Sequence, residues 1–352
     1  MKALVVGAGI AGLAAAWELV RGRCDVAVLE SERRAGGVIV TDTVDGFVIE
    51  GGPDSFLAGE PELPQLAHDL GIAESVVSQQ ARGTALWSGR GLVPVEEGRA
   101  AAVLGIEARS DDVASGFRSF ARGMAQPVAA LAECLAGNLR FAQGVAGIVR
   151  DGAHWRVTIT GGATFDADGI VLALPAYSAG RLLETAGVAG ARVLAEVAYL
   201  PSITVSLAYR AEQVGKPLDG AGFVVAQDAT ETQLRACTYA SRKCPGRAPE
   251  GDVLLRAFLS AAAGDPARIA HADLARILAI RGGPLWSRAF HWNRGLPRYR
   301  PRHAERVAGI RQRLGRLPPL AIAGAGYDGA GVSACVRSGQ TAGKEILKRL
   351  RA

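Results

Sequence analysis

The chain has 352 residues, of which 49% are hydrophobic, and a net charge of +6, which allows two domains with a sizeable core. Basic residues thicken between Arg281 and Arg316, but no nucleic-acid-binding module is visible, which favours a basic surface over a nucleic-acid partner. The five cysteines are scattered, so we expect no metal site and a reducing, cytoplasmic location. The first motif begins at residue 7 and no apolar run approaches ~18 residues, which argues against a signal peptide and stable membrane insertion.

The first thirty residues carry the strongest local pattern. A buried strand is predicted over 2–6, an alanine-rich helix up to about Val20, and a second strand over 26–29 that ends at Glu30. Three glycines stand between the first strand and the helix at the G-x-G-x-x-G spacing, namely Gly7, Gly9 and Gly12. The order of strand, glycine turn, helix, strand and acid predicts a Rossmann-type dinucleotide-binding unit.

Each part of this unit has a physical role toward a dinucleotide. Gly7 permits the tight turn, Gly9 lets the backbone approach a pyrophosphate, and Gly12 lets the helix pack on the strand. The helix N-terminus offers free N–H groups and a partial positive charge to the phosphates. Glu30 can accept hydrogen bonds from a ribose 2′-OH, which disfavours NADP.

A second motif follows directly, because Arg34, Gly36 and Gly37 stand at fixed offsets from Glu30. This stretch resembles the E-x-x-x-R-x-G-G segment of amine-oxidase-type flavoproteins, whose glycines and arginine line the FAD pyrophosphate. The resemblance changes the expected cofactor from any dinucleotide to FAD. A hairpin around Asp45-Gly46 then leads into the turn-rich GGPDSF stretch at 51–56, whose backbone could face an isoalloxazine ring.

The middle and end of the chain alternate helical and strand patterns. In chain order we expect a helix over 60–71, a hairpin over 84–95, a linker over 96–116 with room for one short helix, a helix ending at Gly137, hairpins around Asp151-Gly152 and Gly161-Gly162, and a buried strand over 170–174. Beyond Tyr199 we expect strands of a separate mixed sheet, a helix over 265–280, a loop over 294–303, and a closing strand, glycine turn and helix from about Cys335.

Seven stretches in this order resemble the protoporphyrinogen and coproporphyrinogen oxidases of bacterial heme synthesis. They are GAGIAGLAAA, ESERRAGG, EGGPDSF, VLALPAYSAGRLLE, KCPGRAPEGDVLLRAF, LPRYRPRH and GAGYDGAGVSACVRSGQTA. The resemblance covers residues 1–95 and 117–352, and it implies an α/β fold. Its Rossmann-type, glutathione-reductase-like FAD-binding domain would comprise 1–93, 117–176 and 318–352. A mixed-sheet α+β substrate domain would comprise 177–317, and 94–116 would be a short linker in place of the family's largely helical insert.

The resemblance also implies which residues hold FAD. The adenosine and pyrophosphate contacts would be Gly7, Gly9, Ile10, Ala11, Gly12, Glu30, Ser31, Arg34, Gly36 and Gly37, with Val145 at the adenine and Ala173 nearby. The flavin contacts would be Gly51, Gly52, Pro53, Asp54, Ser55 and Trp292, with Gly326, Tyr327, Gly331, Val332 and Ser333 at its pyrimidine end. A turn or helix N-terminus at that end favours negative charge on the ring.

The implied activity is oxidation of coproporphyrinogen III or protoporphyrinogen IX by hydride transfer to flavin, with O2 as acceptor. Propionate groups need cationic partners, and Arg235, Arg256 and Arg298 are the candidates. We assign no catalytic acid or base, because hydride transfer needs positioning more than a proton shuttle. The shortened linker removes one wall of the substrate cavity, so a second copy or a partner could complete the pocket. Two alternatives stay open: an FAD oxidoreductase acting on an amine or polyene, and a non-catalytic FAD-binding relative.

Overall fold

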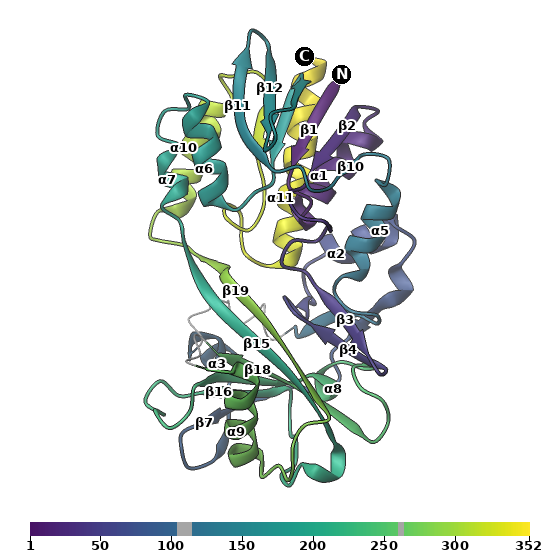
Figure 1. Cartoon of the computed structure of the whole chain (residues 1–352), viewed down its shortest axis with the longest axis vertical. Coiled ribbons are helices and arrows are strands. Elements are labelled where there is room, and N and C mark those ends of the chain that lie inside the picture. The colour runs from purple at the N-terminus through teal and green to yellow at the C-terminus, as the bar shows by residue number, and fades with distance from the viewer. Residues whose placement is uncertain (104–114, 260–263) are drawn as a thin grey trace.

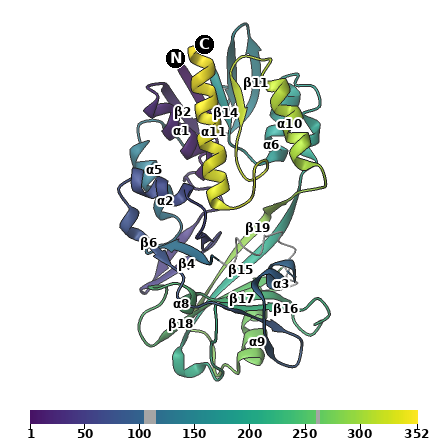
Figure 2. The ribbon, with the colours of Figure 1, turned by 180° about the vertical axis from the view of Figure 1, so that it is seen from behind.

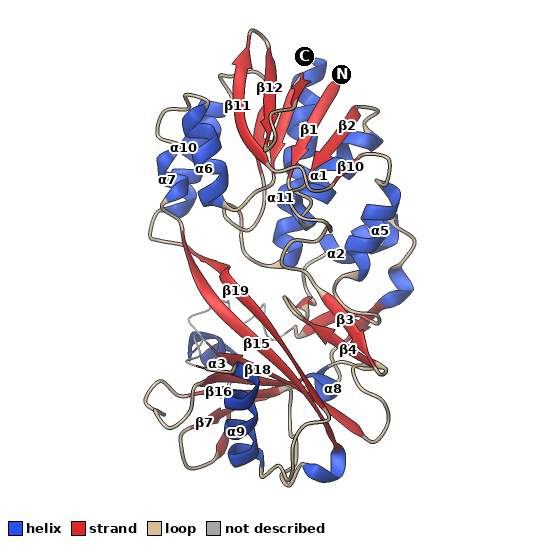
Figure 3. Ribbon diagram, viewed as in Figure 1, coloured by secondary structure: helices blue, strands red, loops and turns tan. Residues whose placement is uncertain are grey.

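The computed structural model describes residues 1–103, 115–259 and 264–352. Figure 1 shows two halves joined by a pair of long strands, with both termini at the far end of the upper half. The reverse view in Figure 2 shows the last helix of the chain running along that half. Figure 3 shows that each half combines strands with helices. The predicted α/β fold with a second, mixed sheet is confirmed.

The upper half is built on a parallel five-stranded sheet. In spatial order its strands are β10 (Leu139–Arg140), β2 (Asp25–Leu29), β1 (Lys2–Val6), β14 (Gly169–Leu172) and β20 (Leu320–Ile322). One face is covered by α1 (Ile10–Arg21), α11 (Val332–Arg351), α2 (Glu62–Asp69) and α5 (Gln126–Cys134). Because successive side chains of a strand point to opposite faces, Ala3 and Val5 belong to this core and Leu4 and Val6 to the other.

The opposite face of the parallel sheet carries a small antiparallel sheet and three helices. These elements are β11 (Val145–Asp151), β12 (His154–Ile159), β13 (Thr164–Ala167), α6 (Ala176–Thr185), α7 (Arg192–Ala195) and α10 (His303–Leu314). The predicted hairpins around Asp151-Gly152 and Gly161-Gly162 are confirmed as the β11–β12 and β12–β13 turns.

The lower half is a mixed seven-stranded sheet. In spatial order its strands are β19 (Trp286–Arg298), β15 (Ala198–Arg210), β18 (Asp252–Leu259), β17 (Leu234–Tyr239), β16 (Gly222–Val225), β7 (Thr84–Trp87) and β8 (Leu92–Val95). Only the β16–β7 pair is parallel among these strands as described. Helix α9 (Pro266–Leu278) packs its apolar side on this sheet, and α3 (Glu97–Val103) and α8 (Ala240–Lys243) lie at its margins.

Short elements connect the halves. They are the hairpin β3 (Thr41–Val44) and β4 (Phe47–Glu50), the strands β5 (Phe56–Leu57), β6 (Val76–Ser78) and β9 (Phe117–Phe120), and the 3-10 turn η1 (Ala73–Ser75). A second 3-10 turn, η2 (Ala211–Gln213), follows β15 within the lower half. The predicted turn at Asp45-Gly46 is confirmed, with both residues at positive φ. No helix in the described parts of the chain is both long and apolar enough to cross a bilayer.

Several segments lie differently from the prediction. The hairpin β7–β8, placed with the FAD-binding domain, joins the lower sheet through β16 because strand pairing at this distance leaves no local signal. Helices α6, α7 and α10, placed with the substrate domain, bury their apolar sides on the parallel sheet. The predicted loop at 294–303 is wrong in its first half, which extends β19. The predicted linker at 96–116 contains the short helix α3, and its residues 104–114 lie outside the described residues. The division into domains stays a prediction.

Candidate functional site

The glycine turn after β1 is packed so closely that two of its glycines accept no side chain. A Cβ on Gly7, whose φ is +100°, would lie 2.5 Å from the carbonyl oxygen of Ala173. A Cβ on Gly12 would lie 1.9 Å from the carbonyl oxygen of Gly7. These contacts bring β1, β14 and α1 together at the carboxyl ends of the strands, where open α/β sheets bind their ligands.

Gly9 differs from its two neighbours, because a Cβ built on it would meet no atom within 4 Å. It is the N-cap of α1 in an extended conformation that any residue adopts. The second motif lies directly alongside, since the Gly36 N–H donates to the Ala8 carbonyl at 2.8 Å. Arg34 folds back to donate to the Gly37 carbonyl at 2.7 Å. The turn therefore borders open space that a side chain at Gly9 would enter, at the positive end of α1.

Glu30 marks the predicted adenosine end and is buried at the end of β2. Its carboxylate accepts N–H bonds from Ala8 at 2.7 Å and Glu32 at 2.9 Å, and a hydroxyl bond from Ser31 at 3.1 Å. A carboxylate has about four acceptor sites, so one stays open for a ribose hydroxyl. The Glu30 carbonyl accepts the Gln143 N–H at 2.8 Å, which brings the start of β11 and Val145 close.

The loop at 51–55 lies where the two halves of the molecule meet. The Gly51 carbonyl accepts bonds from the Trp292 indole at 2.7 Å and the Thr204 hydroxyl at 3.1 Å, so the two long strands hold it directly. A Cβ on Gly52 would lie 1.8 Å from the Val38 carbonyl. The structure thus brings Trp292 to this loop, although its stacking on the flavin stays a prediction.

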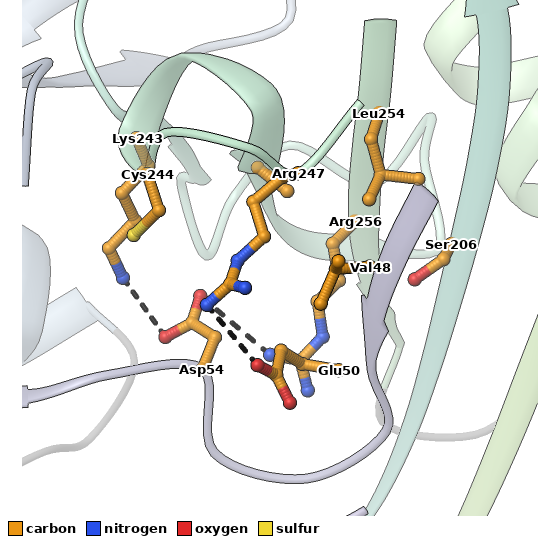
Figure 4. A pocket seen from close by; sticks show the side chains of 10 residues that line it. Val48, Glu50, Asp54, Ser206, Lys243, Cys244, Arg247, Leu254 and Arg256 are labelled. Atoms are coloured by element: carbon orange, nitrogen blue, oxygen red, sulfur yellow. Dashed lines mark hydrogen bonds and ion pairs between the residues drawn. The ribbon is translucent and has the colours of Figure 1, made fainter. Parts of the chain in front are cut away.

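A group of five charged side chains underlies this loop, and we call it the buried charge cluster. Its members are Glu50, Asp54, Lys243, Arg247 and Arg256, which come from β4, α8, β18 and the loops after β4 and α8. They line a cavity of ≈ 10 Å³, and Figure 4 shows their charged groups converging. Burial alone would raise the pKa of Asp54, but Lys243 and Arg256 hold that pKa well below its usual range. Burial raises the pKa of Glu50 although Arg247 lies 3.3 Å away.

The closing turn before α11 forms the other end of the site. Tyr327 donates its hydroxyl to the Leu174 carbonyl at 3.0 Å, and Tyr299 donates to the Ala325 carbonyl at 2.5 Å. A Cβ on Gly326 would lie 2.8 Å from that of Ala176. Asp328 forms a bidentate pair with Arg311 at 2.7 and 2.6 Å. The turn is therefore anchored on all sides and fixes the N-terminus of α11.

Eight buried side-chain polar atoms have no hydrogen-bond partner among the described residues, and two of the eight lie at opposite ends of the site. These two are Oε1 of Gln143, next to the predicted adenosine end, and Oγ of Ser333, in the first turn of α11. Unpaired buried polar atoms are uncommon in native proteins and call for a partner. Together with the open space at Gly9, these two atoms fit a long, polar cofactor.

The three predicted substrate arginines do not converge. Arg256 is 4% exposed and donates to the Gly52 carbonyl, so its role in this structure is to support the loop. In the sheet register Arg298 lies opposite Ala198 of β15, and Arg256 lies opposite Ser206 of the same strand. These two positions of β15 are eight residues apart, which corresponds to about 26 Å along the strand. Arg235 is exposed on β17 and Arg298 is exposed at the end of β19.

The sequence prediction missed the residues that hold the two loops, above all Lys243, Arg247, Thr204 and Tyr299. Lys243 and Arg247 belong to the stretch KCPGRAPE, which the resemblance singled out without assigning a role. Their partners lie more than a hundred residues away in the chain. In the same region His303 stacks on Tyr299 at 4.5 Å, and burial lowers the pKa of His303.

The sequence model that represents the family of flavin-containing amine oxidoreductases matches this chain over residues 10–122 and 92–347. The chain belongs to this family, and its cofactor is FAD. The site described above supplies the elements such a cofactor needs: a glycine turn at a helix N-terminus, an acid after β2, and a second backbone-lined loop.

Relatives from several bacteria match nearly the whole chain. A coproporphyrinogen III oxidase of Bacillus subtilis (strain 168) is 23% identical over 99% of this chain and 98% of its own. A coproporphyrinogen III oxidase of Propionibacterium freudenreichii is 26% identical over 98% of this chain and 90% of its own. The fold matches a crystal structure from Exiguobacterium sp. 255-15, provisionally described as a protoporphyrinogen oxidase, with a TM-score of 0.84 and 23% identity over 99% and 98%. The chain is thus similar to porphyrinogen oxidases in a shortened form.

Proposed function

We propose that this protein is an FAD-dependent oxidase that removes hydride from coproporphyrinogen III or protoporphyrinogen IX. The observation that carries the proposal is its similarity, over nearly its full length, to proteins named coproporphyrinogen III oxidase. The position of the loop at 51–55 supports it, because a flavin beside that loop would face the boundary between the two halves. A large, flat substrate needs such a boundary to be enclosed on both faces.

The chain's own residues would bind and orient FAD without taking part in the chemistry. When bound, FAD would supply the hydride acceptor, and O2 would serve as the final electron acceptor of the proposed reaction. The Gly9 turn and the start of α1 would hold the pyrophosphate, and Glu30 the ribose. The N-terminus of α11 at Gly331 and Val332 would present N–H groups to the pyrimidine end. No described side chain is assigned as acid or base.

Carboxylate recognition would fall to arginines at the end of β19 and at the start of α10, where the long strands meet the helices of the upper half. Arg298 lies beside Arg300, Arg306 and His303 in a small hollow whose single acidic lining residue is Glu196. Arginine suits this task because its planar fork matches a carboxylate. Arg298 is therefore the better candidate of the predicted set, and Arg256 is assigned to the loop.

A second candidate is an FAD oxidoreductase acting on an amine or polyene. It is favoured by the shortness of the chain, since the alignment with the Bacillus relative spans 467 positions and this chain has 352 residues. Losing a wall of a tetrapyrrole cavity removes apolar burial worth ~25 cal/mol per Å². We therefore expect weak porphyrinogen turnover by the monomer unless a second copy or a partner completes the pocket. The remaining alternative is an FAD-binding relative without catalytic activity.

The test is a steady-state assay on purified, FAD-loaded protein, following porphyrin fluorescence and oxygen consumption. Coproporphyrinogen III, protoporphyrinogen IX and a simple diamine are supplied separately. We expect oxidation of a porphyrinogen and a raised KM in Arg298→Met, with Arg288→Met as control, because Arg288 on the same strand pairs with Asp42 at 3.0 Å. Turnover of the diamine alone would reject the proposed substrate and leave the cofactor assignment intact.

A further inference from the structure

We propose that Lys243 is a positioning residue, which fixes the flavin-side loop at 51–55 through its buried ion pair with Asp54. The inference deepens the proposed function, since it rests on the placement of the isoalloxazine ring beside this loop. Lys243 ends the short helix α8 in the lower half, and the loop follows β4 in the connecting region. The pair therefore adds a side-chain link between two parts of the molecule that are also joined by the backbone bond from the Val48 N–H to the Arg247 carbonyl at 3.2 Å.

The contacts of Lys243 are all directed at this loop and its support. Its Nζ donates to Oδ1 of Asp54 at 3.0 Å and to Oγ of Ser55 at 2.9 Å, and it lies 4.9 Å from the ring centroid of Phe117. The Ser55 hydroxyl in turn donates to Oδ1 of Asp54 at 2.7 Å. The lysine side chain is 12% exposed, so water screens this ion pair little.

Arg256 completes the hold from β18. Its guanidinium donates to the Gly52 carbonyl and lies 3.8 Å from Oδ2 of Asp54. The loop is thus fixed at Gly52, Asp54 and Ser55 by two cations from elements about two hundred residues away in the chain. Figure 4 shows Lys243 and Arg256 on opposite sides of the Asp54 carboxylate.

The net charge of the buried charge cluster gives it a role beside a flavin. Three cations face two carboxylates, so the cluster carries excess positive charge beneath a loop predicted to touch a ring that gains negative charge on reduction. A buried ion pair adds little net stability compared with apolar residues of the same volume. Its specific effect is to fix geometry and field, which are the properties a flavin senses.

The test compares Lys243→Met with Lys243→Arg and a matched control. In Lys243→Met the Asp54 carboxylate loses its nearest cation, and we expect the Kd for FAD to rise about tenfold or more, as for loss of other supporting contacts. The visible spectrum of bound FAD should change and its reduction potential fall. Lys243→Arg should restore these properties in large part. Arg210→Met breaks the pair between the exposed Arg210 and Asp252 at 2.9 Å in the same sheet, far from the loop at 51–55 in the strand register, and should change none of them.

Folding failure of Lys243→Met would leave the double variant Lys243→Met/Asp54→Asn as the deciding protein, because it removes both charges of the pair while Arg256 keeps its bond to the Gly52 carbonyl. This variant should fold, yet still bind FAD with an altered spectrum and potential. If either folded variant matches the parent in FAD affinity, spectrum and potential, the positioning role is wrong. None of these measurements uses a porphyrinogen, so they are independent of the outcome for the proposed substrate.

Discussion

Single glycines separate the requirements of the fold from those of FAD binding. A Cβ on Gly12 would overlap the Gly7 carbonyl, whereas one on Gly9 would meet nothing within 4 Å. Gly9→Leu should therefore leave the free energy of unfolding of the apoprotein within about 0.5 kcal/mol of the parent. It should nevertheless abolish FAD binding, because the side chain would occupy the place of the pyrophosphate. Urea unfolding and fluorescence titration with FAD measure the two effects.

Gly12→Leu is the matched control, and it should fail to fold. A Gly9→Leu protein that kept full FAD affinity would show that the pyrophosphate does not lie against this turn. Loss of both folding and binding in Gly9→Leu would show that the fold itself does not tolerate a side chain at Gly9.

The Glu50–Arg247 pair predicts a stability loss that depends on pH. Arg247 is 2% exposed and donates to Oγ of Ser119 at 2.7 Å as well as pairing with Glu50. Arg247→Met leaves the buried carboxylate unpaired, so we expect a loss of about 3–5 kcal/mol near neutral pH. Burial raises the folded-state pKa of Glu50 above its unfolded value of about 4.3, so protonation favours the folded state.

The loss in Arg247→Met should therefore shrink as the pH falls toward about 4.3 and grow as the pH rises through the folded pKa of Glu50. Urea unfolding of both proteins at pH 5 and pH 8 measures this difference. An equal loss at the two values would mean that the missing hydrogen bonds of Arg247, and not the charge of Glu50, cause the destabilisation.

At the scale of elements, the contact between α1 and α11 gives the upper half its compact cofactor face. A Cβ on Gly339 of α11 would lie 2.0 Å from the Ala11 carbonyl of α1. Gly339→Ala should destabilise the protein by about 1–3 kcal/mol through overpacking. In contrast, a Cβ on Gly309 of α10 meets only the end of Arg313 at 3.8 Å, so Gly309→Ala should stabilise by about 0.5–1 kcal/mol.

Thermal or urea unfolding of the two alanine variants tests this pair. Equal, small changes in both would show that α1 and α11 lie further apart than described here. Gly339 packs against Ala11, which is one of the predicted FAD contacts. We therefore expect Gly339→Ala to weaken FAD binding as well.

Local patterns in the sequence were enough to predict the elements of the cofactor end. The β1–α1–β2 unit and the three hairpins are defined by neighbouring residues, and glycines at Gly7, Gly9 and Gly12 fix the turn. The pairing of β7 with β16 was not predictable, because about 140 residues separate the two strands and no local pattern in either strand indicates which strand it pairs with. The same holds for Lys243 and Asp54, whose hydrogen bond spans 189 positions of the chain.

For the whole molecule, two halves meet at the loop predicted to lie beside the flavin. The long strands β15 and β19 run from the helices of the upper half into the lower sheet (Figure 1). Trp292 and Thr204 on these strands hold Gly51, and the buried charge cluster holds the rest of the loop. Substrate and cofactor would therefore meet where both halves contribute residues, so the positions of the halves decide which substrate fits.

The central claim is that FAD in this site accepts hydride from a porphyrinogen. Anaerobic mixing of the FAD-loaded protein with coproporphyrinogen III, followed in the visible absorption of the flavin, tests it most directly. We predict loss of the oxidised flavin band together with the appearance of porphyrin fluorescence, and recovery of the band when O2 is admitted. A band that persists with coproporphyrinogen III and protoporphyrinogen IX, but bleaches with a small amine, would contradict the claim.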